Sequence, residues 1–297
     1  MDKGIYHIDS IQPDLSPRRE ILEKIPEISK TIKMYDIDSA FICGLLERFR
    51  PKKILEVGVF GGGTTAVILQ CMKDLGEPFE MYSVDVAKHE HVDFTFEVGY
   101  MAKQAAKLLE VSDYHLYKGK YLPQLMDQIG GGIDFLILDT VHILPGEILD
   151  FLVAYPYLTN GAVVCLHDIR QNHVANPDSR RIATNALFNS VAAEKYIFSD
   201  PTRTPDYPNT GAFVVNEDTS RYINNVFGIL TLSWSSFLDE EVMSLYKSFL
   251  RKHYTVESVW IFEHALALNL ESKMRKDRQI RRSPLKWIAN KLSKILS

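Results

Sequence analysis

Acids and imidazoles follow two apolar segments of the chain, directly after the point where each segment ends. IDFLILDTVH carries Asp139 and His142 after its apolar run, and AVVCLHDI carries His167 and Asp168. Imidazole exchanges a proton near neutral pH, and carboxylates accept protons or bind divalent cations. These four residues are therefore candidate catalytic residues, and Asp139 and Asp168 are also candidate metal ligands.

A glycine-rich stretch, KILEVGVFGGGTT, is the second candidate site. It carries more glycines than a strand-to-helix turn needs, and glycine lets a ligand approach the backbone closely. A phosphate-binding P-loop is excluded, because no Gly-Lys-Ser/Thr follows the glycines. A dinucleotide fingerprint fits Gly61, Gly63 and Ala66, with Asp85 in place to hold a ribose. A second frame, E-x-G-x-x-x-G, begins at Glu56 and fits equally well by spacing.

The segments around these residues alternate between strand and helix patterns. The pattern predicts strands over 52–59, 80–86, 115–118, 133–139 and 162–167, with helices over 64–75, 99–110, 122–129 and 145–158. Strands that are apolar throughout are buried on both faces, as in a parallel sheet covered by helices. The alternation therefore predicts a doubly wound α/β sheet, in which ligands bind outside the carboxyl ends of the strands.

Two further strands are expected after this alternating region. They lie over 195–198 and 212–216, and a proline-rich loop without a helical pattern joins them. A parallel pair needs a long crossover connection, whereas this loop allows the two strands to pair antiparallel. The sheet is therefore expected to be mostly parallel with an antiparallel last strand.

Three runs of the sequence carry a specific family resemblance: FICGLLERFRPKKILEVGVFGGGTTAVIL, IDFLILDTVHILPGEILDFLVAYPYLTNGAVVCLHDI and NTGAFVVNE. Together they resemble class I S-adenosylmethionine-dependent methyltransferases of bacterial surface-glycan and natural-product clusters, the group of macrocin O-methyltransferase and cephalosporin hydroxylase-like proteins. The resemblance covers roughly residues 35–220. It implies a seven-stranded Rossmann-like sheet with an antiparallel last strand.

The resemblance also implies a set of residues that bind S-adenosylmethionine: Glu56, Gly58, Gly62, Gly63, Thr64, Asp85 and Asp139. In that set Asp85 accepts hydrogen bonds from the ribose hydroxyls, and Asp139 lies below the methyl-transfer centre. His167 and Asp168 match the pair after the fifth strand. Metal-dependent relatives have two acids there, whereas His167 is an imidazole and Mg²⁺ prefers oxygen ligands.

The function expected from these observations is methyl transfer from S-adenosylmethionine to an oxygen, with a sugar hydroxyl of a surface glycan or glycosylated metabolite as acceptor. The sulfonium is already activated, so positioning supplies much of the rate. His167 beside Asp168 is the preferred base for the hydroxyl proton, and His142 is the alternative. A divalent cation such as Mg²⁺ on Asp139 and Asp168 could instead lower the pKa of the acceptor.

Two other functions stay open as rivals. A nicotinamide-dependent oxidoreductase would use the dinucleotide frame, but no Tyr-x-x-x-Lys stands in a suitable place to supply its proton donor. A non-catalytic module would keep the cofactor pocket and bind the cofactor without turnover.

Composition and patterning divide the 297 residues into four parts. They are a helical segment 1–50, an α/β domain 51–218 that the resemblance implies is an S-adenosylmethionine-binding methyltransferase domain, a helical extension 219–272 and a basic tail 273–297. With 46% hydrophobic and 24% charged residues, the composition is that of a globular protein. No apolar run is long enough for a transmembrane helix, and no export signal is recognisable, so a cytoplasmic location is expected.

The three cysteines, Cys43, Cys71 and Cys165, lie within apolar patterns. We expect them to be small buried side chains in a reducing compartment, because neither a disulfide framework nor zinc-ligand spacing is present.

The tail 273–297 carries nine lysines and arginines and one aspartate, although the whole chain has a net charge of -4. An acidic body with a basic tail does not indicate a nucleic-acid binder. Leu285, Ile288, Leu292 and Ile295 share one helical face beside Trp287, which is the pattern of a basic helix lying on an anionic membrane. The alternative is a terminal helix that packs on its own body or on a second subunit of a homo-oligomer.

Overall fold

A mixed β-sheet runs through the middle of the computed structural model, which describes residues 8–90, 92–171, 181–198 and 209–282. Over these residues the sheet has the strand order β1-β7-β8-β6-β5-β2-β3-β4. The strands are β1 (Ile8–Ser10), β2 (Lys53–Val57), β3 (Glu80–Asp85), β4 (Tyr114–Lys118), β5 (Ile133–Leu138), β6 (Leu158–Leu166), β7 (Glu194–Ile197) and β8 (Gly211–Val214).

The pairing pattern confirms the predicted fold class. The last strand, β8, runs antiparallel to both of its neighbours, β6 and β7. The other neighbouring strands pair parallel to one another. The sheet therefore has the mostly parallel seven-stranded core expected of a methyltransferase fold, with β1 added at one edge.

The added strand is a difference from the sequence prediction, which assigned only helices to residues 1–50. Residues 8–10 pair parallel with β7, with Ile8 opposite Lys195. An unpaired edge strand exposes a row of backbone N–H and C=O groups, and β1 covers one such edge. A three-residue strand has too little periodicity to be recognised from sequence.

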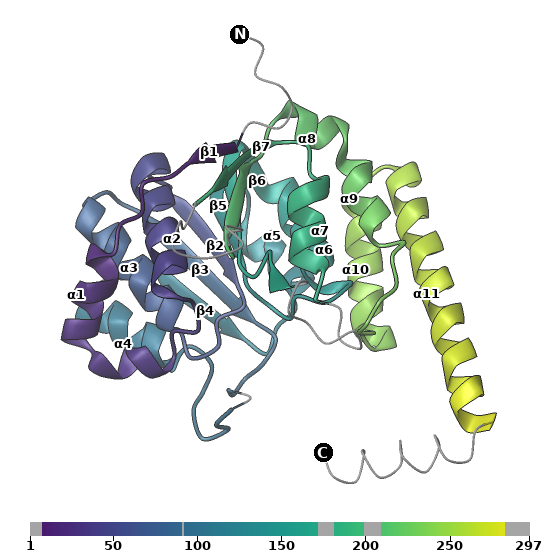
Figure 1. Cartoon of the computed structure of the whole chain (residues 1–297), viewed down its shortest axis with the longest axis horizontal. Helices are drawn as coiled ribbons and strands as arrows, with labels where there is room; N and C mark the ends of the chain where they lie inside the picture. The colour runs from purple at the N-terminus through teal and green to yellow at the C-terminus, as the bar shows by residue number, and fades with distance from the viewer. Residues whose placement is uncertain (1–7, 91, 172–180, 199–208, 283–297) are drawn as a thin grey trace.

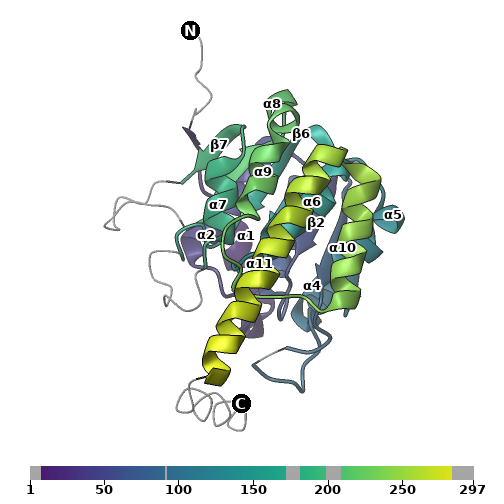
Figure 2. The same ribbon diagram turned by 90° about the vertical axis from the view of Figure 1, so that its right-hand side faces the viewer.

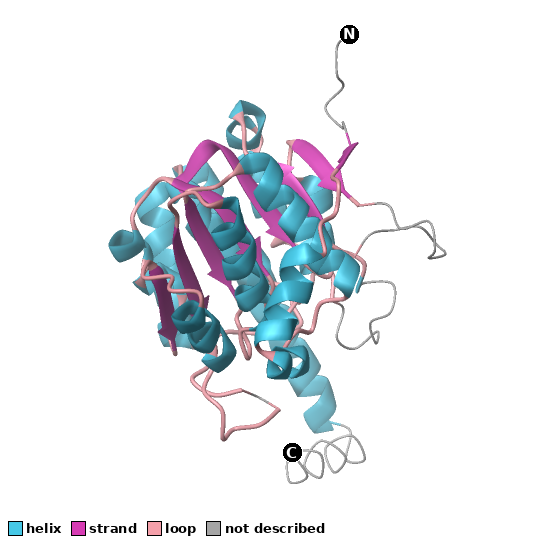
Figure 3. Ribbon diagram, turned by 90° about the vertical axis from the view of Figure 1, so that its left-hand side faces the viewer, coloured by secondary structure: helices cyan, strands magenta, loops and turns pink. Residues whose placement is uncertain are grey.

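Helices cover both faces of the sheet (Figures 1 and 3). One face carries α1 (Ser16–Lys24), η1 (Pro26–Lys30), α2 (Asp36–Phe49), α3 (Gly63–Leu75) and α4 (Tyr100–Leu108). The other carries η2 (Leu122–Gln124), α5 (Met126–Ile129), α6 (Gly146–Ala154), α7 (Ala183–Ser190), α9 (Ile223–Ile229), α10 (Glu240–His253) and α11 (Val256–Arg282).

The central strand β5 shows why the strands are apolar throughout. Phe135 and Ile137 pack into the core on the side of α2 and α3, whereas Leu136 and Leu138 pack into the core on the side of α6. Successive side chains of a strand point to opposite faces, so both faces of β5 need apolar residues.

The C-terminal extension packs on the domain through α9 and α10, and α11 crosses the outside of this layer (Figure 2). Within the described ranges, none of the helices has the length and apolar character needed to cross a bilayer. Residues 283–297 lie outside the described residues, so the predicted amphipathic face of the tail is untested. The three cysteines are buried free thiols, as expected.

Candidate active site

The glycine-rich loop between β2 and α3 begins where two strands end side by side. Gly58 has a φ of +92°, and a Cβ atom on it would lie 1.9 Å from the carbonyl oxygen of Asp139. The Asp139 N–H donates to the carbonyl oxygen of Val57 at 3.0 Å. Gly58 is therefore required so that the end of β2 can lie directly against the end of β5.

The next three glycines are packed against other parts of the chain. A Cβ atom on Gly61 or Gly63 would lie within about 2.5 Å of Thr31 or Ile32, which follow η1. Gly62, with a φ of +86°, lies against Ala102 of α4. These close contacts account for the three glycines by packing inside the protein.

The carboxyl group of Glu56 lies beneath this loop and is only 2% exposed. It accepts hydrogen bonds from Thr65 Oγ1 at 2.8 Å and Ser83 Oγ at 2.6 Å. Burial raises the pKa of Glu56 to about 7, although both hydrogen bonds act to lower it. Glu56 thus ties β2 to α3 and β3.

Asp85, at the end of β3, holds the other side of the loop. Its Oδ2 atom accepts from the backbone N–H groups of Val59 at 3.0 Å and Phe60 at 3.2 Å. Its Oδ1 atom accepts from the N–H of Ala87 at 2.8 Å. The carboxylate is therefore held in one orientation by three backbone donors.

A cavity of about 390 Å³ opens at the carboxyl ends of these strands. This size lies in the range of small-molecule sites. Among the predicted site residues, Gly58, Asp85 and Asp139 line it. Glu56, Gly62, Gly63 and Thr64 are not among the described residues of its wall. Most of the wall is apolar and comes from α6 and from the ends of β2 and β3 with the loops that follow β2, β3, β4 and β5, and it is completed by Ser236, Leu238 and Tyr246 of the C-terminal extension.

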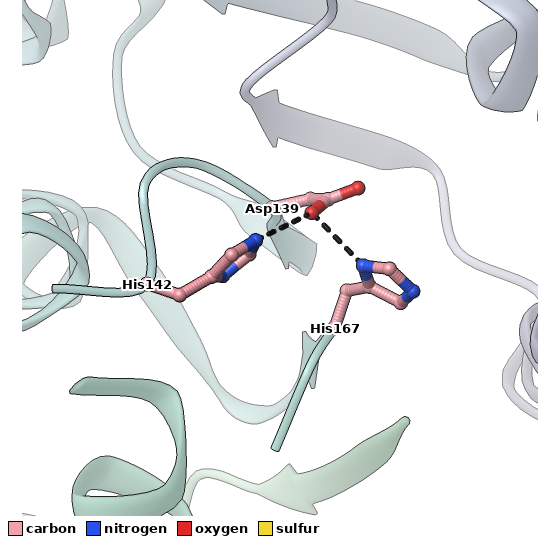
Figure 4. Close-up of side chains that lie close together, drawn as sticks. All are labelled: Asp139, His142 and His167. Atoms are coloured by element: carbon pink, nitrogen blue, oxygen red, sulfur yellow. Dashed lines mark hydrogen bonds and ion pairs between the residues drawn. The ribbon is translucent and has the colours of Figure 1, made fainter. Parts of the chain in front are cut away.

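Asp139, His142 and His167 lie close together after β5 and β6 (Figure 4), and Asp139 also lines the cavity. His167 Nδ1 lies 3.0 Å from Asp139 Oδ1, and His142 Nε2 lies 3.6 Å from the same oxygen. His142 Nε2 is also 3.1 Å from Asp168 Oδ2. The structure thus brings together all four residues that the sequence analysis singled out as catalytic.

Asp139 is the member of this cluster that borders the cavity. His142, His167 and Asp168 are 6%, 6% and 8% exposed and are not among the described residues of the cavity wall. The Nε2 atom of His167 lies 3.3 Å from Asn209 Nδ2 and 3.9 Å from Asp38 Oδ2. The imidazole of His167 therefore contacts Asp139 but does not itself line the cavity.

Three residues of the cluster were not identified from the sequence: Asp38, Glu147 and Asn209. Asp38 comes from α2, and Thr210 Oγ1 donates to its Oδ1 at 2.8 Å. Glu147 accepts from the backbone N–H of His142 at 2.6 Å. Asn209 Nδ2 donates to Asp168 Oδ1 at 2.9 Å. An acid within an otherwise apolar helical segment is the available sequence signal for Asp38 and Glu147, whereas no local signal indicates Asn209.

Charge pairing shifts the pKa values of the cluster. Burial disfavours the charged imidazole of His167, but Asp139 and the other nearby carboxylates outweigh burial and raise its pKa well above its usual value. The pKa of His142 is also raised, because Glu147, Asp139 and Asp168 outweigh burial. Burial acts to raise the pKa of Asp139, but His167 and His142 lower it overall.

The cluster does not fit Mg²⁺ in this arrangement. Both Asp168 oxygens accept from amide groups, Oδ1 from Asn209 and Oδ2 from Gln171. Ligand atoms of Asp139, His142 and His167 lie within 4.8 Å of one another. However, the hydrogen bond between His167 and Asp139 places a proton where a metal would need a lone pair, and Mg²⁺ prefers oxygen ligands. The described arrangement is a proton-sharing network.

The glycine-rich loop, Asp85 and the four predicted catalytic residues lie within one continuous segment of the chain. Residues 55–169 match the family model of a methyltransferase domain. Within the matched segment, Gly58, Asp85 and Asp139 line one cavity. No curated protein matches the chain in sequence.

Solved structures share the fold of this chain at low sequence identity. Cofactor-bound Rv0187 from MTB is 15% identical, with a TM-score of 0.51 over 69% of this chain and 91% of its own. The O-methyltransferase from Bacillus cereus in complex with SAH is 16% identical, with a TM-score of 0.50 over 69% and 92% of the two chains. These likenesses support the fold.

Proposed function

We propose that the chain is an S-adenosylmethionine-dependent O-methyltransferase. The observation that carries the proposal is the cavity of the methyltransferase domain, where Asp85 and Asp139 stand at the ends of two strands. In parallel α/β sheets this edge is where ligands bind.

The residues of the cavity fit this cofactor. Asp85 is held by three backbone N–H groups and keeps further lone pairs for the two hydroxyls of a ribose. Val57, Val84 and Leu122 supply apolar wall for a base. When bound, S-adenosylmethionine supplies an activated methyl group on a positive sulfonium.

Asp139 is the group proposed to contact the acceptor hydroxyl. Its side chain is 24% exposed, and His167 binds one of its two oxygens. When His167 is neutral and its Nδ1 atom carries no proton, Asp139 can take the hydroxyl proton and pass it to Nδ1, so that the proton ends on an imidazolium beside a carboxylate. His142 and Asp168 hold the pair in place through their own contacts.

The acceptor is proposed to be a sugar hydroxyl of a glycan or a glycosylated metabolite. This part of the proposal depends on the sequence resemblance described above. Incubation with nucleotide sugars and glycosides, followed by mass spectrometry, would identify an acceptor as the compound that gains one methyl group.

The packing of the glycines argues against the nicotinamide rival. Its fingerprint needs the backbone at Gly61 and Gly63 to approach a pyrophosphate, but both glycines are packed against Thr31 and Ile32. A bound ligand raises the melting temperature of the folded chain. S-adenosylhomocysteine should therefore raise the melting temperature, and NAD⁺ should not.

The Asp85→Ala variant gives a second test of the same pocket. It should lose most of the thermal shift caused by S-adenosylhomocysteine, because the ribose loses its acceptor. A shift by NAD⁺ alone, or a full shift in the variant, would contradict the proposed function.

A further inference from the structure

The cavity has a second polar end, which the proposed reaction does not use. Asp139 follows β5 and Asp85 ends β3, and the strand order β5-β2-β3-β4 places β2 between these two strands. Both residues line the cavity. Beyond them Tyr121 and Leu122 continue the wall after β4. In this region α10 packs against both η2 and α6. The end of the cavity near β4 is therefore closed by the C-terminal extension.

An aspartate and a tyrosine meet at this closure. Asp150 comes from α6 and Tyr246 from α10, and both line the cavity. The Tyr246 hydroxyl donates to Asp150 Oδ1 at 2.9 Å. Tyr246 is only 4% exposed, so the bond holds Asp150 in a fixed place. Along the parts of the chain that are described, no Lys or Arg forms an ion pair with Asp150.

A carboxyl group in such a wall needs a polar partner. Leu122, Leu149 and Leu238 line the same cavity. Burial raises the pKa of Asp150 to about 7, although the Tyr246 hydrogen bond acts to lower it. A buried carboxyl without a cation is costly unless it is hydrogen-bonded. Among the described residues, the hydrogen bond of Asp150 to Tyr246 uses Oδ1, so Oδ2 can accept an N–H group from a ligand in the cavity.

The proposed cofactor has such a group at the matching end. If the ribose lies at Asp85 and the sulfonium faces Asp139, the base must extend from the ribose in the other direction, toward β4 and α6. Adenine carries an exocyclic amine that donates and, next to it, a ring nitrogen that accepts. We propose that Asp150, positioned by Tyr246, binds the amine edge of adenine and selects an adenine nucleoside.

This inference depends on the proposed function, and it gives the C-terminal extension a role in cofactor binding. The matched domain ends at residue 169, whereas Tyr246 lies in α10. Replacing adenine by hypoxanthine turns the amine into a carbonyl and the accepting ring nitrogen into a donor. The Asp150 carboxyl group should therefore bind the hypoxanthine analogue more weakly than the adenine compound.

Calorimetry on the full chain with S-adenosylhomocysteine and S-inosylhomocysteine tests the assignment. The wild-type chain should bind the adenine compound about 10- to 100-fold more tightly. In Asp150→Asn the new amide can donate to the hypoxanthine carbonyl, so the preference should fall to within about threefold or reverse. Tyr246→Phe should reduce the preference by a smaller factor, because Asp150 loses only its positioning bond.

A second Asp–Tyr pair, which lies outside the cavity wall, supplies controls. Tyr157 donates to Asp127 at 2.5 Å, and neither residue is part of the cavity wall. Asp127→Asn and Tyr157→Phe should keep the wild-type preference. The melting temperature without ligand checks that every variant is folded.

The outcomes separate this inference from the proposed function. A wild-type chain that does not bind S-adenosylhomocysteine would overturn the proposed function, and the assignment with it. A wild-type chain that binds it, with an unchanged preference in Asp150→Asn and Tyr246→Phe, would overturn only the assignment of Asp150.

Discussion

The Nδ1 atom of His167 lies 3.0 Å from Oδ1 of Asp139, so an imidazole stands directly behind a carboxylate of the cavity wall. Sequence reasoning assigned the role of base to His167 itself. The geometry instead makes Asp139 the group that faces the cavity. In the proposed reaction His167 acts through Asp139, since the other nitrogen of His167 lies near Asn209 and Asp38.

Replacing Asp139 by asparagine should abolish most methyl transfer. The amide keeps the size of the side chain but cannot take up a proton, so the single-turnover rate should fall by about 10²- to 10⁴-fold. The rate is measured with saturating cofactor, and Asp127→Asn serves as an exposed control. A rate within threefold of wild type would contradict the role of Asp139.

Replacing His167 separates its hydrogen bond from its proton uptake. In His167→Asn the amide can still donate to Asp139, whereas His167→Ala removes the donor. We expect both variants to lose about 10²-fold or more in rate, while binding of S-adenosylhomocysteine changes little. If His167→Asn kept the wild-type rate, the imidazole would serve only as a hydrogen-bond donor.

The rate of transfer should rise with pH. The pKa of His167 is raised well above 6.5, so at low pH the imidazole is protonated and the Asp139–His167 pair cannot take up another proton. As the pH passes upward through the raised pKa, the neutral form appears and the rate increases. Initial rates from pH 6 to pH 9.5 check this, and a rate that falls across this range would argue against the pair as base.

Removal of divalent cations should leave transfer unchanged. The Asp168 oxygens are taken by Asn209 and Gln171, and His167 donates to Asp139, so these groups do not form a Mg²⁺ site. Turnover is compared before and after treatment with EDTA. A loss of activity that added Mg²⁺ restores would show that the cluster rearranges to bind a metal.

Replacing Glu56 by glutamine should alter the pH dependence of stability. Its pKa is about 7 in the folded chain against an ordinary value of 4.5, so the folded state binds the proton more tightly. This contribution is fully present below about pH 4.5 and is lost as the pH rises through about 7.

The size of this effect can be measured by urea unfolding at pH 5 and pH 8. The fall in unfolding free energy from pH 5 to pH 8 should be smaller in Glu56→Gln than in the wild-type chain, by on the order of 3 kcal/mol. Glu27→Gln, at an exposed position, is the control. Equal falls in both variants would show that Glu56 is not the group responsible.

Contact with anionic membranes is one of the two interpretations of the basic end of the chain, and it can be tested against packing on the body or on a second subunit. The last described turns of α11 carry exposed Lys273, Arg275, Lys276 and Arg278. We expect the full chain to sediment with phosphatidylserine vesicles, less with neutral vesicles, and less after removal of residues 275–297. Equal partitioning of the two chains would mean that this segment makes no membrane contact.

Much of the fold could be predicted from the sequence alone. The apolar strands and the helices between them follow from local patterns, and the parallel order of the strands then places Asp85, Asp139 and His167 at one edge. The antiparallel last strand was also predictable, because no helix pattern separates it from the strand before it.

The chemical roles within the site were decided by tertiary structure. Gly61 and Gly63 read as ligand-binding glycines, but residues about 30 positions earlier in the chain pack against them. Asn209 and Asp38 reach His167 from distant segments, and their contacts turn its imidazole away from the cavity. Tyr246 reaches Asp150 across 96 positions of the chain. Local sequence determines which residues end each strand, whereas the direction of a side chain depends on which remote atoms bind it.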